Sequence, residues 1–273
     1  MLRLDKIHPV ISGNKWFKLK YYLENFKKNN FYGILTFGGA YSNHIIATAY
    51  AAKLAGIKCK GIIRGETPPE LSHTLKECIK YGMQLEFVTR ENYRQKNLLI
   101  ERGQNFPGYY TIPEGGAGPL GEKGCREILD LVNKETYSHF ACAVGTGTMF
   151  IGLANSSLPQ QHIIGISVLK GMKNLTDQFN ELVYQPEKIK YSKIFYDYHG
   201  GGYARYTPEL FSFMNDFYLQ TGIPTDFVYT GKLVYAIKDL VKKGYFPLGS
   251  RLLIIHSGGL QGNISVPKGT LIF

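Results

Sequence analysis

The chain has 273 residues, which is enough for one large domain or two modest ones. Apolar residues make up 44% of it and charged residues only 19%, so a packed core is feasible and global disorder is disfavoured. The sequence has no run of about 18 apolar residues, which argues against a membrane-spanning helix. Its first residues, MLRLDKIHPV, lack the apolar run of a signal peptide.

Cysteine spacing and net charge restrict the surroundings and partners of the chain. The four cysteines show no C-x-x-C spacing, so neither a disulfide framework nor a metal site is predicted, and a reducing, cytoplasmic compartment fits best. The net charge is +11, but lysines and arginines are scattered among acids and no nucleic-acid-binding motif appears. We therefore expect no nucleic acid and no membrane as partner, whereas an anionic small-molecule ligand is compatible with this charge.

Helical and strand patterns alternate through the first third of the chain. Apolar residues at helical spacing, beginning at Trp16, predict an amphipathic helix over 15–28. A short apolar strand over 32–37 ends at two glycines, and an Ala-rich helix over 43–55 ends at a third glycine. The pattern then predicts a strand over 58–63, a helix over 71–81 and a strand over 85–88.

The same alternation continues after a Gly-rich loop at 114–121. The predicted elements are a helix near 122–133, a strand over 139–144, a helix through about 155, a strand over 162–168, helices near 208–220 and 232–243, and a final strand over 251–256. This order is typical of an α/β protein with parallel sheets. Several glycine clusters follow predicted strands, at the carboxyl ends where open α/β sheets bind ligands.

The first cluster with chemical potential is Ser12-Gly13-Asn14-Lys15. Asn14 is a good N-cap for the helix that follows, which places Lys15 in the first turn. The positive end of the helix disfavours another cation, so we expect a lowered pKa and a more available neutral amine. A neutral amine can form a Schiff base with an aldehyde. The ordinary explanation, a solvated lysine at a helix start, fits the same residues.

The second cluster, Gly38 to His44, lies between a strand and the Ala-rich helix. Ser42 is a natural N-cap, and the free backbone N–H groups there suit a carboxylate or a phosphate. Ser42, Asn43 and His44 add a hydroxyl, an amide and an imidazole at the same place. A capped helix after a glycine turn explains the pattern equally well, and His44 alone is more typical of a partly buried histidine.

The third cluster is Val144-Gly145-Thr146-Gly147-Thr148, again between a strand and a helix. Its two glycines allow the backbone to approach an anion, and a helix start favours phosphate. The motif is neither G-x-G-x-x-G nor a Walker A sequence, so a monophosphate fits better than a nucleotide. An ordinary Gly-rich turn remains an alternative.

The C-terminal part contains three short segments in which a tyrosine or a hydroxyl group lies beside glycine. Each segment alone is typical of a turn: Gly200 to Tyr203, Val228 to Lys232 and His256 to Gly259.

Taken together, the first three clusters describe a site for pyridoxal phosphate and an amino acid. They offer a lysine for a Schiff base, a helix start that binds a carboxylate and a turn that binds a monophosphate.

Six motifs, in chain order, resemble those of the pyridoxal-phosphate enzymes that include 1-aminocyclopropane-1-carboxylate deaminase and D-cysteine desulfhydrase. The motifs are SGNKWFKL (12–19), GGAYSNHIIATAYAAKLAG (38–56), IPEGGAGPLGEKG (112–124), VGTGT (144–148), VYTGK (228–232) and HSGG (256–259). The resemblance implies a tryptophan-synthase-β-like fold, of fold type II. It implies two α/β domains with mainly parallel sheets, a smaller one over 31–118 and a larger one over 1–30 plus 119–273, with the cofactor between them. It also implies a homodimer.

The resemblance assigns a role to each motif. Lys15 would hold pyridoxal 5'-phosphate and shuttle protons, while Ser42 would bind the substrate carboxylate and assist proton transfer. Thr230 or Ser257 would lie near the pyridine nitrogen. The implied catalytic residues are Lys15, Ser42, Tyr203 and Tyr229; the cofactor-binding residues are Lys15, Asn43, Gly145, Thr146, Gly147, Thr148, Thr230 and Ser257; the substrate-binding residues are Ser42, Asn43, His44, Tyr203 and Tyr229; no metal is expected.

The residue between Tyr229 and Gly231 divides two activities within the resemblance. The deaminases carry Tyr-Glu-Gly-Lys, whereas this chain has Thr230, as the desulfhydrases do. We therefore expect D-cysteine to be converted to pyruvate, ammonia and sulfide, with opening of the cyclopropane amino acid to 2-oxobutanoate and ammonia as the alternative. A catalytically silent cofactor-binding protein is a third reading, because Met149 replaces a family threonine and the chain begins almost at the lysine motif.

Overall fold

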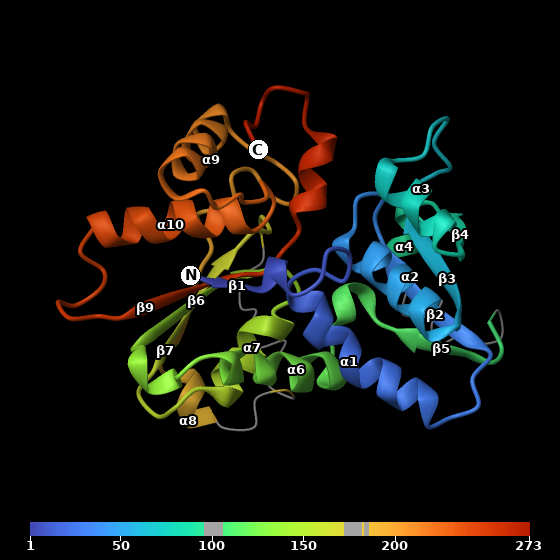
Figure 1. Cartoon of the computed structure of the whole chain (residues 1–273), viewed down its shortest axis with the longest axis horizontal. Coiled ribbons are helices and arrows are strands. Elements are labelled where there is room, and N and C mark those ends of the chain that lie inside the picture. The colour runs from blue at the N-terminus through green and yellow to red at the C-terminus, as the bar shows by residue number, and fades with distance from the viewer. Residues whose placement is uncertain (96–105, 172–181, 183–185) are drawn as a thin grey trace.

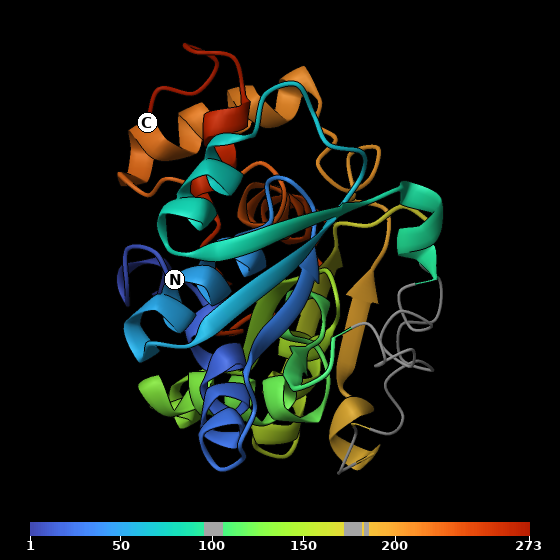
Figure 2. The same cartoon turned by 90° about the vertical axis from the view of Figure 1, so that its right-hand side faces the viewer.

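The computed structural model describes residues 1–95, 106–171, 182 and 186–273. In this part the chain forms two parallel sheets that lie side by side (Figure 1). The smaller sheet has the order β4-β3-β2-β5, and its strands all run in one direction (Figure 2). They are β2 (Gly33–Gly38), β3 (Lys58–Arg64), β4 (Met83–Val88) and β5 (Tyr109–Ile112).

The larger sheet has the order β1-β9-β6-β7-β8 and is also parallel throughout. The residues just before the lysine motif contribute its edge, because Leu2 pairs with Ile255 and Arg3 with His256. Its strands are β1 (Leu2–Arg3), β6 (His139–Val144), β7 (His162–Ser167), β8 (Ser192–Phe195) and β9 (Leu252–His256).

Helices cover both faces of the larger sheet, with α9 and α10 on one side and α6 and α7 on the other (Figure 1). This double cover explains why β6 is buried along its whole length, as the apolar run of its sequence predicts. The helices of the chain are α1 (Asn14–Lys27), α2 (Asn43–Ala55), α3 (His73–Lys80), α4 (Arg90–Arg94), α6 (Pro119–Arg126), α7 (Thr148–Ser156), α8 (Pro186–Ile189), α9 (Pro208–Thr221) and α10 (Thr230–Lys242).

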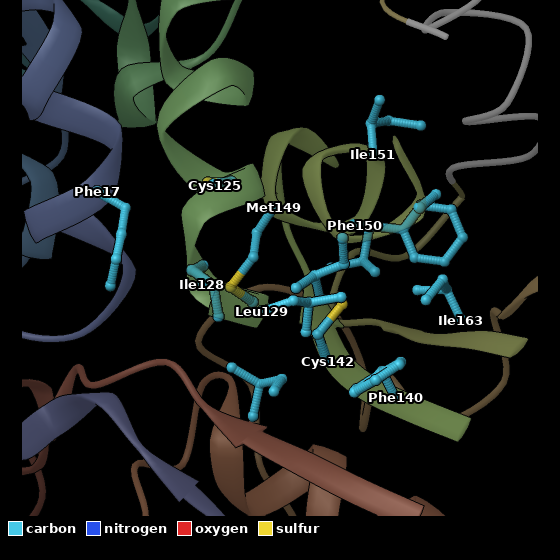
Figure 3. Close-up of a cluster of buried hydrophobic side chains, with 14 of the residues drawn as sticks. Phe17, Cys125, Ile128, Leu129, Phe140, Cys142, Met149, Phe150, Ile151 and Ile163 are labelled. Carbon is cyan, nitrogen blue, oxygen red and sulfur yellow. The ribbon is translucent and has the colours of Figure 1, made fainter. Parts of the chain in front are cut away.

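One buried cluster fixes the helices that carry the site (Figure 3). Phe17 of α1 packs in it with Cys125 of α6, Phe140 of β6, and Met149 and Phe150 of α7. The start of α1 and the start of α7 are therefore held against the same core. The apolar side chains of this cluster stabilise that arrangement by roughly 1.5–3 kcal/mol for each large side chain that is fully buried.

The α/β class and the parallel sheets predicted from the sequence are confirmed, with small changes at element boundaries. The predicted helix near 122–133 is wrong in its bounds, because α6 begins at Pro119 and gives way to a 3-10 helix over Glu127–Leu131. The pattern missed the short elements β1, β5, β8, α4 and α8. The smaller sheet falls inside 31–118 and the larger sheet outside it, while the domain bounds themselves stay a prediction. None of the helices in the described ranges has the length and apolar character needed to cross a membrane.

Candidate active site

A cavity of about 580 Å³ gathers residues that are far apart in the sequence. It receives the start of α1, the turn between β2 and α2, the turn between β6 and α7, and the residues after β9. Ten predicted site residues line it: Lys15, Ser42, Asn43, His44, Gly145, Thr146, Gly147, Tyr203, Tyr229 and Ser257. The glycine clusters at the ends of the strands are thus brought together, as open α/β sheets bring ligand-binding loops together.

The start of α1 is locked onto the end of β9. Gly13 is the N-cap, with a φ of 66° and no side-chain cap, so the prediction that Asn14 is the N-cap is wrong. The backbone N–H of Asn14 instead donates to the carbonyl of Ser257 at 3.2 Å. A Cβ on Gly13 would lie 1.8 Å from that same carbonyl oxygen, so only glycine fits there. This close approach fixes Lys15 relative to Ser257.

Lys15 has the lowered pKa that the sequence predicts, but for a different main reason. Burial lowers the pKa of its amine well below the ordinary value, and the nearby charge of Lys18 lowers it further. Its Nζ donates to the carbonyl of Gly115 at 3.4 Å. The effect of the helix end that the sequence suggested is not needed to explain this shift.

Lys18 is a residue of this cavity that the sequence analysis missed. It lies one turn after Lys15 on α1, and its Nζ donates to the Gly115 carbonyl at 3.3 Å and to Thr146 Oγ1 at 3.2 Å. Its side chain is buried, and no carboxylate of the described residues pairs with it. The three-residue spacing from Lys15 was the available signal, because such residues share a helix face.

The start of α2 has the predicted cap. Ser42 Oγ accepts from the backbone N–H groups of His44 at 3.2 Å and Ile45 at 3.3 Å. Asn43 follows as the first helical residue, and its Oδ1 accepts from Gln261 Nε2 at 2.8 Å. The hydroxyl, the amide and the positive end of α2 therefore face the cavity from the smaller sheet.

His44 is a buried neutral imidazole in one tautomer. The hydroxyl of Thr36 donates to the Ile112 carbonyl at 2.9 Å, so it accepts from His44 Nε2 at 2.7 Å. Burial lowers the pKa of His44 well below its ordinary value, and the charges of Lys15 and Lys18 add to this effect. Nδ1 is then a buried acceptor without a hydrogen-bond partner among the described residues.

The turn after β6 gives the cavity three of its predicted residues but not the fourth. Gly145, Thr146 and Gly147 line it, and Gly147 is the left-handed N-cap of α7. Thr148 is buried outside the lining, where its hydroxyl lies 3.0 Å from that of Thr146. Met149 lines the cavity while also packing in the buried cluster.

Two tyrosines stand together on the opposite wall. The rings of Tyr203 and Tyr229 meet edge to face, with their centroids 6.1 Å apart. Burial raises the pKa of both hydroxyls, so both are protonated at neutral pH. Thr230 does not line the cavity, because its hydroxyl donates to Asp226 Oδ1 at 2.6 Å. Ser257 does line it, at the end of β9.

Other lining residues were not predicted. They include Ser12 and Asn14 within the lysine motif, Glu114 and Gly115 in the Gly-rich loop, and Arg64 at the end of β3. Position at the end of a strand was the available signal for Arg64, Glu114 and Gly115, since β3 ends at Arg64 and β5 ends at Ile112. Over the described ranges, the His, Cys, Asp and Glu side chains form no group of three or more placed to hold a metal ion.

Comparison with known proteins shows which family the chain matches. The sequence model of the family described as pyridoxal-phosphate dependent enzyme matches residues 1–258. A solved structure described as a homologue of 1-aminocyclopropane-1-carboxylate deaminase superposes with a TM-score of 0.80 and 27% identity, covering 95% of this chain and 84% of that chain. The predicted resemblance and fold type II are thereby confirmed.

The names of two relatives state the activities assigned to proteins similar to this chain. A Pyrococcus abyssi protein named as a candidate 1-aminocyclopropane-1-carboxylate deaminase is 31% identical, over 92% of this chain and 81% of its own length. An Arabidopsis thaliana mitochondrial protein is named as a bifunctional D-cysteine desulfhydrase and 1-aminocyclopropane-1-carboxylate deaminase. It is 27% identical, over 92% of this chain and 70% of its own length.

Proposed function

The chain belongs to the family of pyridoxal-phosphate dependent enzymes, and from this premise we propose that it breaks down a small amino acid by β-elimination, D-cysteine first. The observation that carries the proposal is the buried amine of Lys15, whose lowered pKa favours the neutral form. It shares one cavity with a capped helix start and two protonated tyrosines.

The residues of the cavity fit the cofactor. Lys18 is buried without a carboxylate partner among the described residues, and burial lowers its pKa. A bound anion would stabilise its charged form, because a buried cation is costly unless an anion accompanies it. Gly145 to Gly147 and the start of α7 lie beside it and suit a phosphate. Bound pyridoxal phosphate supplies an aldehyde for amine attachment and a ring that withdraws electrons from the substrate Cα.

The proposed cofactor contacts follow from this placement. Lys15 would hold the cofactor covalently, while Lys18 and the turn after β6 would bind its phosphate. Asn43 would reach the ring hydroxyl, and Ser257 would face the pyridine nitrogen. Thr148 would act on the phosphate contacts indirectly, through Thr146. Thr230, whose hydroxyl donates to Asp226, is the alternative to Ser257 near the pyridine nitrogen.

The remaining residues would serve the substrate. The N–H groups at the start of α2, together with Ser42, would bind its carboxylate. The hydrogen bond between His44 and Thr36 would hold the start of α2 in position. The freed Lys15 amine would take the proton from Cα. The protonated hydroxyls of Tyr203 and Tyr229 could donate to the departing sulfur.

The direct test is release of sulfide and pyruvate from D-cysteine by the purified chain with added pyridoxal phosphate, with L-cysteine as the control. We expect turnover of the D-isomer, and none in Lys15→Ala. Full activity of Lys15→Ala would overturn the assignment of this lysine. Cofactor binding without a response to any amino acid would indicate the silent cofactor-binding protein instead.

The names of the relatives supply a second candidate, opening of the cyclopropane amino acid. That substrate has no α-proton, so a nucleophile or removal of a β-proton must begin the reaction, and Tyr203, Tyr229 and Ser42 are available in the cavity. Formation of 2-oxobutanoate from the cyclopropane amino acid, without sulfide from D-cysteine, would establish this second function.

The cellular location, the oligomeric state and the domain division of the chain are proposals as well. We propose a cytoplasmic location, which the four free, buried cysteines support. We propose a homodimer, which rests on the family resemblance, and analytical ultracentrifugation of the purified chain would test it. The division at 30/31 and 118/119 into two domains is supported by the two separate sheets.

A further inference from the structure

A second cavity of about 340 Å³ adjoins the first. Gly39, Ser42, Asn43, Arg64, Tyr203 and Tyr229 line both. A water molecule occupies about 30 Å³ of liquid, so this side cavity holds far more than the single sulfur of a cysteine side chain needs. It therefore leaves room for a longer substituent that begins at the substrate Cβ.

Arg64 lies where the two cavities join. It is the last residue of β3, and a Cβ on Gly39 would lie 3.6 Å from its Nη2, so its guanidinium extends over the turn that leads to Ser42. The guanidinium carbon is 5.8 Å from the centroid of the Tyr93 ring, which supports it from one side. Burial raises the pKa of Tyr203 and the Arg64 charge opposes that rise, so this charge is felt inside the site.

Arg64 forms no ion pair within 4.0 Å with any other residue that the structure describes. Asp226 also lines the side cavity, but its carboxylate already accepts from the backbone of Val228, Tyr229 and Thr230 and from the Thr230 hydroxyl.

Two further charged residues line the cavities. Glu114 lines the main cavity and interacts with the hydroxyl of Tyr93; burial is the larger cause of the raised pKa of that hydroxyl, and Glu114 raises it further. Arg205 also lines the side cavity, and it is an exposed residue. The charged residues that line the side cavity are thus Arg64, Arg205 and Asp226, and the oxygens of the single carboxylate already accept four hydrogen bonds.

We propose that the site recognises amino acids whose side chain ends in an anionic group, and that Arg64 binds this group where the two cavities join. This inference rests on the proposed function and names its substrate class. A guanidinium suits a carboxylate or a phosphate because its planar fork donates two parallel hydrogen bonds.

S-carboxymethylcysteine is an amino acid of this class, because its side chain ends in a carboxylate. The Cα–H bond breaks and its proton goes to Lys15, the electron pair forms the Cα–Cβ double bond, and the Cβ–S bond breaks with its pair on sulfur. The sulfur takes up a proton and leaves as mercaptoacetate, and water hydrolyses the remaining enamine to pyruvate and ammonia. No oxidant or reductant is needed.

The test compares this acid with its neutral isostere, S-carbamoylmethylcysteine, using both stereoisomers of each on the cofactor-loaded enzyme. The readouts are the apparent dissociation constant, from the change in cofactor absorbance, and kcat/KM for pyruvate. We expect the wild type to prefer the acid by about tenfold or more. Arg64→Gln should lose this preference, while Arg251→Gln, which removes an exposed charge outside both cavities, should keep it.

The outcomes separate the two proposals. Equal binding of acid and amide by a wild type that turns over D-cysteine overturns this inference alone. A preference that survives in Arg64→Gln also overturns it, by removing Arg64 as the anion-binding residue. Absence of any response to D-cysteine and to both probes overturns the proposed function, and this inference with it.

Discussion

Lys232 Nζ donates a 2.8 Å hydrogen bond to the carbonyl of Gly202, the residue directly before Tyr203. A second bond of 2.7 Å goes from the same ammonium to the carbonyl of His199. The side chain of Lys232 is only 1% exposed, so these bonds are shielded from water. One buried lysine of α10 therefore holds the glycine turn that presents Tyr203 to the cavity.

Lys232→Met should misplace Tyr203 without touching the cofactor. The turn at 200–202 has three glycines with positive φ, and such backbone holds a single conformation only when its surroundings constrain it. We expect kcat/KM for the amino acid to fall by about 10- to 100-fold, while the affinity for pyridoxal phosphate stays the same. Steady-state kinetics and a cofactor titration measure the two effects.

Lys238→Met is the matched control, because it makes the same change on an exposed position of the same helix. It should leave both quantities unchanged. Unaltered kinetics in Lys232→Met would contradict the role of Lys232 as a positioning residue.

Gly13→Ala should prevent the start of α1 from docking on β9. The added methyl group would lie 1.8 Å from the carbonyl oxygen of Ser257. We expect the free energy of unfolding to fall by about 4 kcal/mol or more, measured by chemical denaturation. Gly56→Ala is the control, because Gly56 has the same φ of 66° but open space around it. It should cost only about 1 kcal/mol, and equal losses in the two variants would show that the clash is relieved.

Asp226→Asn should destabilise the turn between Pro224 and α10. The buried carboxylate accepts four hydrogen bonds, and an amide would turn one acceptor into a donor that faces other donors. We expect a loss of about 2–3 kcal/mol in the free energy of unfolding. Asp130→Asn, which removes an exposed pair with Lys134, should cost no more than about 0.5 kcal/mol. Comparable losses in the two variants would contradict this account.

Lys18→Met should alter the titration of Lys15. The charge of Lys18 lowers the pKa of Lys15, so its removal raises that pKa and reduces the neutral fraction of the amine at a given pH. At saturating pyridoxal phosphate, the pH midpoint for cofactor attachment should move upward, which a series of absorbance spectra would show. Lys20→Met, on the exposed side of α1, should leave the midpoint unchanged. A midpoint that stays fixed or moves downward in Lys18→Met would refute this coupling.

The sequence allowed the alternation of strands and helices to be predicted because its buried strands are continuous apolar runs. The strand over 139–144 and the helix over 43–55 were predicted at their true bounds. The short strands β1 and β8 carry too few residues for a period, and pairing with neighbours far away in the sequence stabilises them.

The limits of the site prediction have a similar cause. Motifs placed directly after strands, such as Ser42 to His44, could be recognised locally. The burial of Lys15 could not, because it depends on the packing of α1 against the Gly-rich loop, although the spacing of Lys18 on the same helix was a local signal. Thr230 lies outside the cavity lining, where its hydroxyl donates to Asp226, and its role toward the cofactor stays a prediction.

The most direct test of the account is to identify the lysine that holds the cofactor. The purified chain would be incubated with pyridoxal phosphate, reduced with borohydride and digested, and its peptides analysed by mass spectrometry. The account predicts a pyridoxyl phosphate label on Lys15, absent from Lys15→Ala. A label confined to another lysine, such as Lys18, or no label at all, would contradict the central claim.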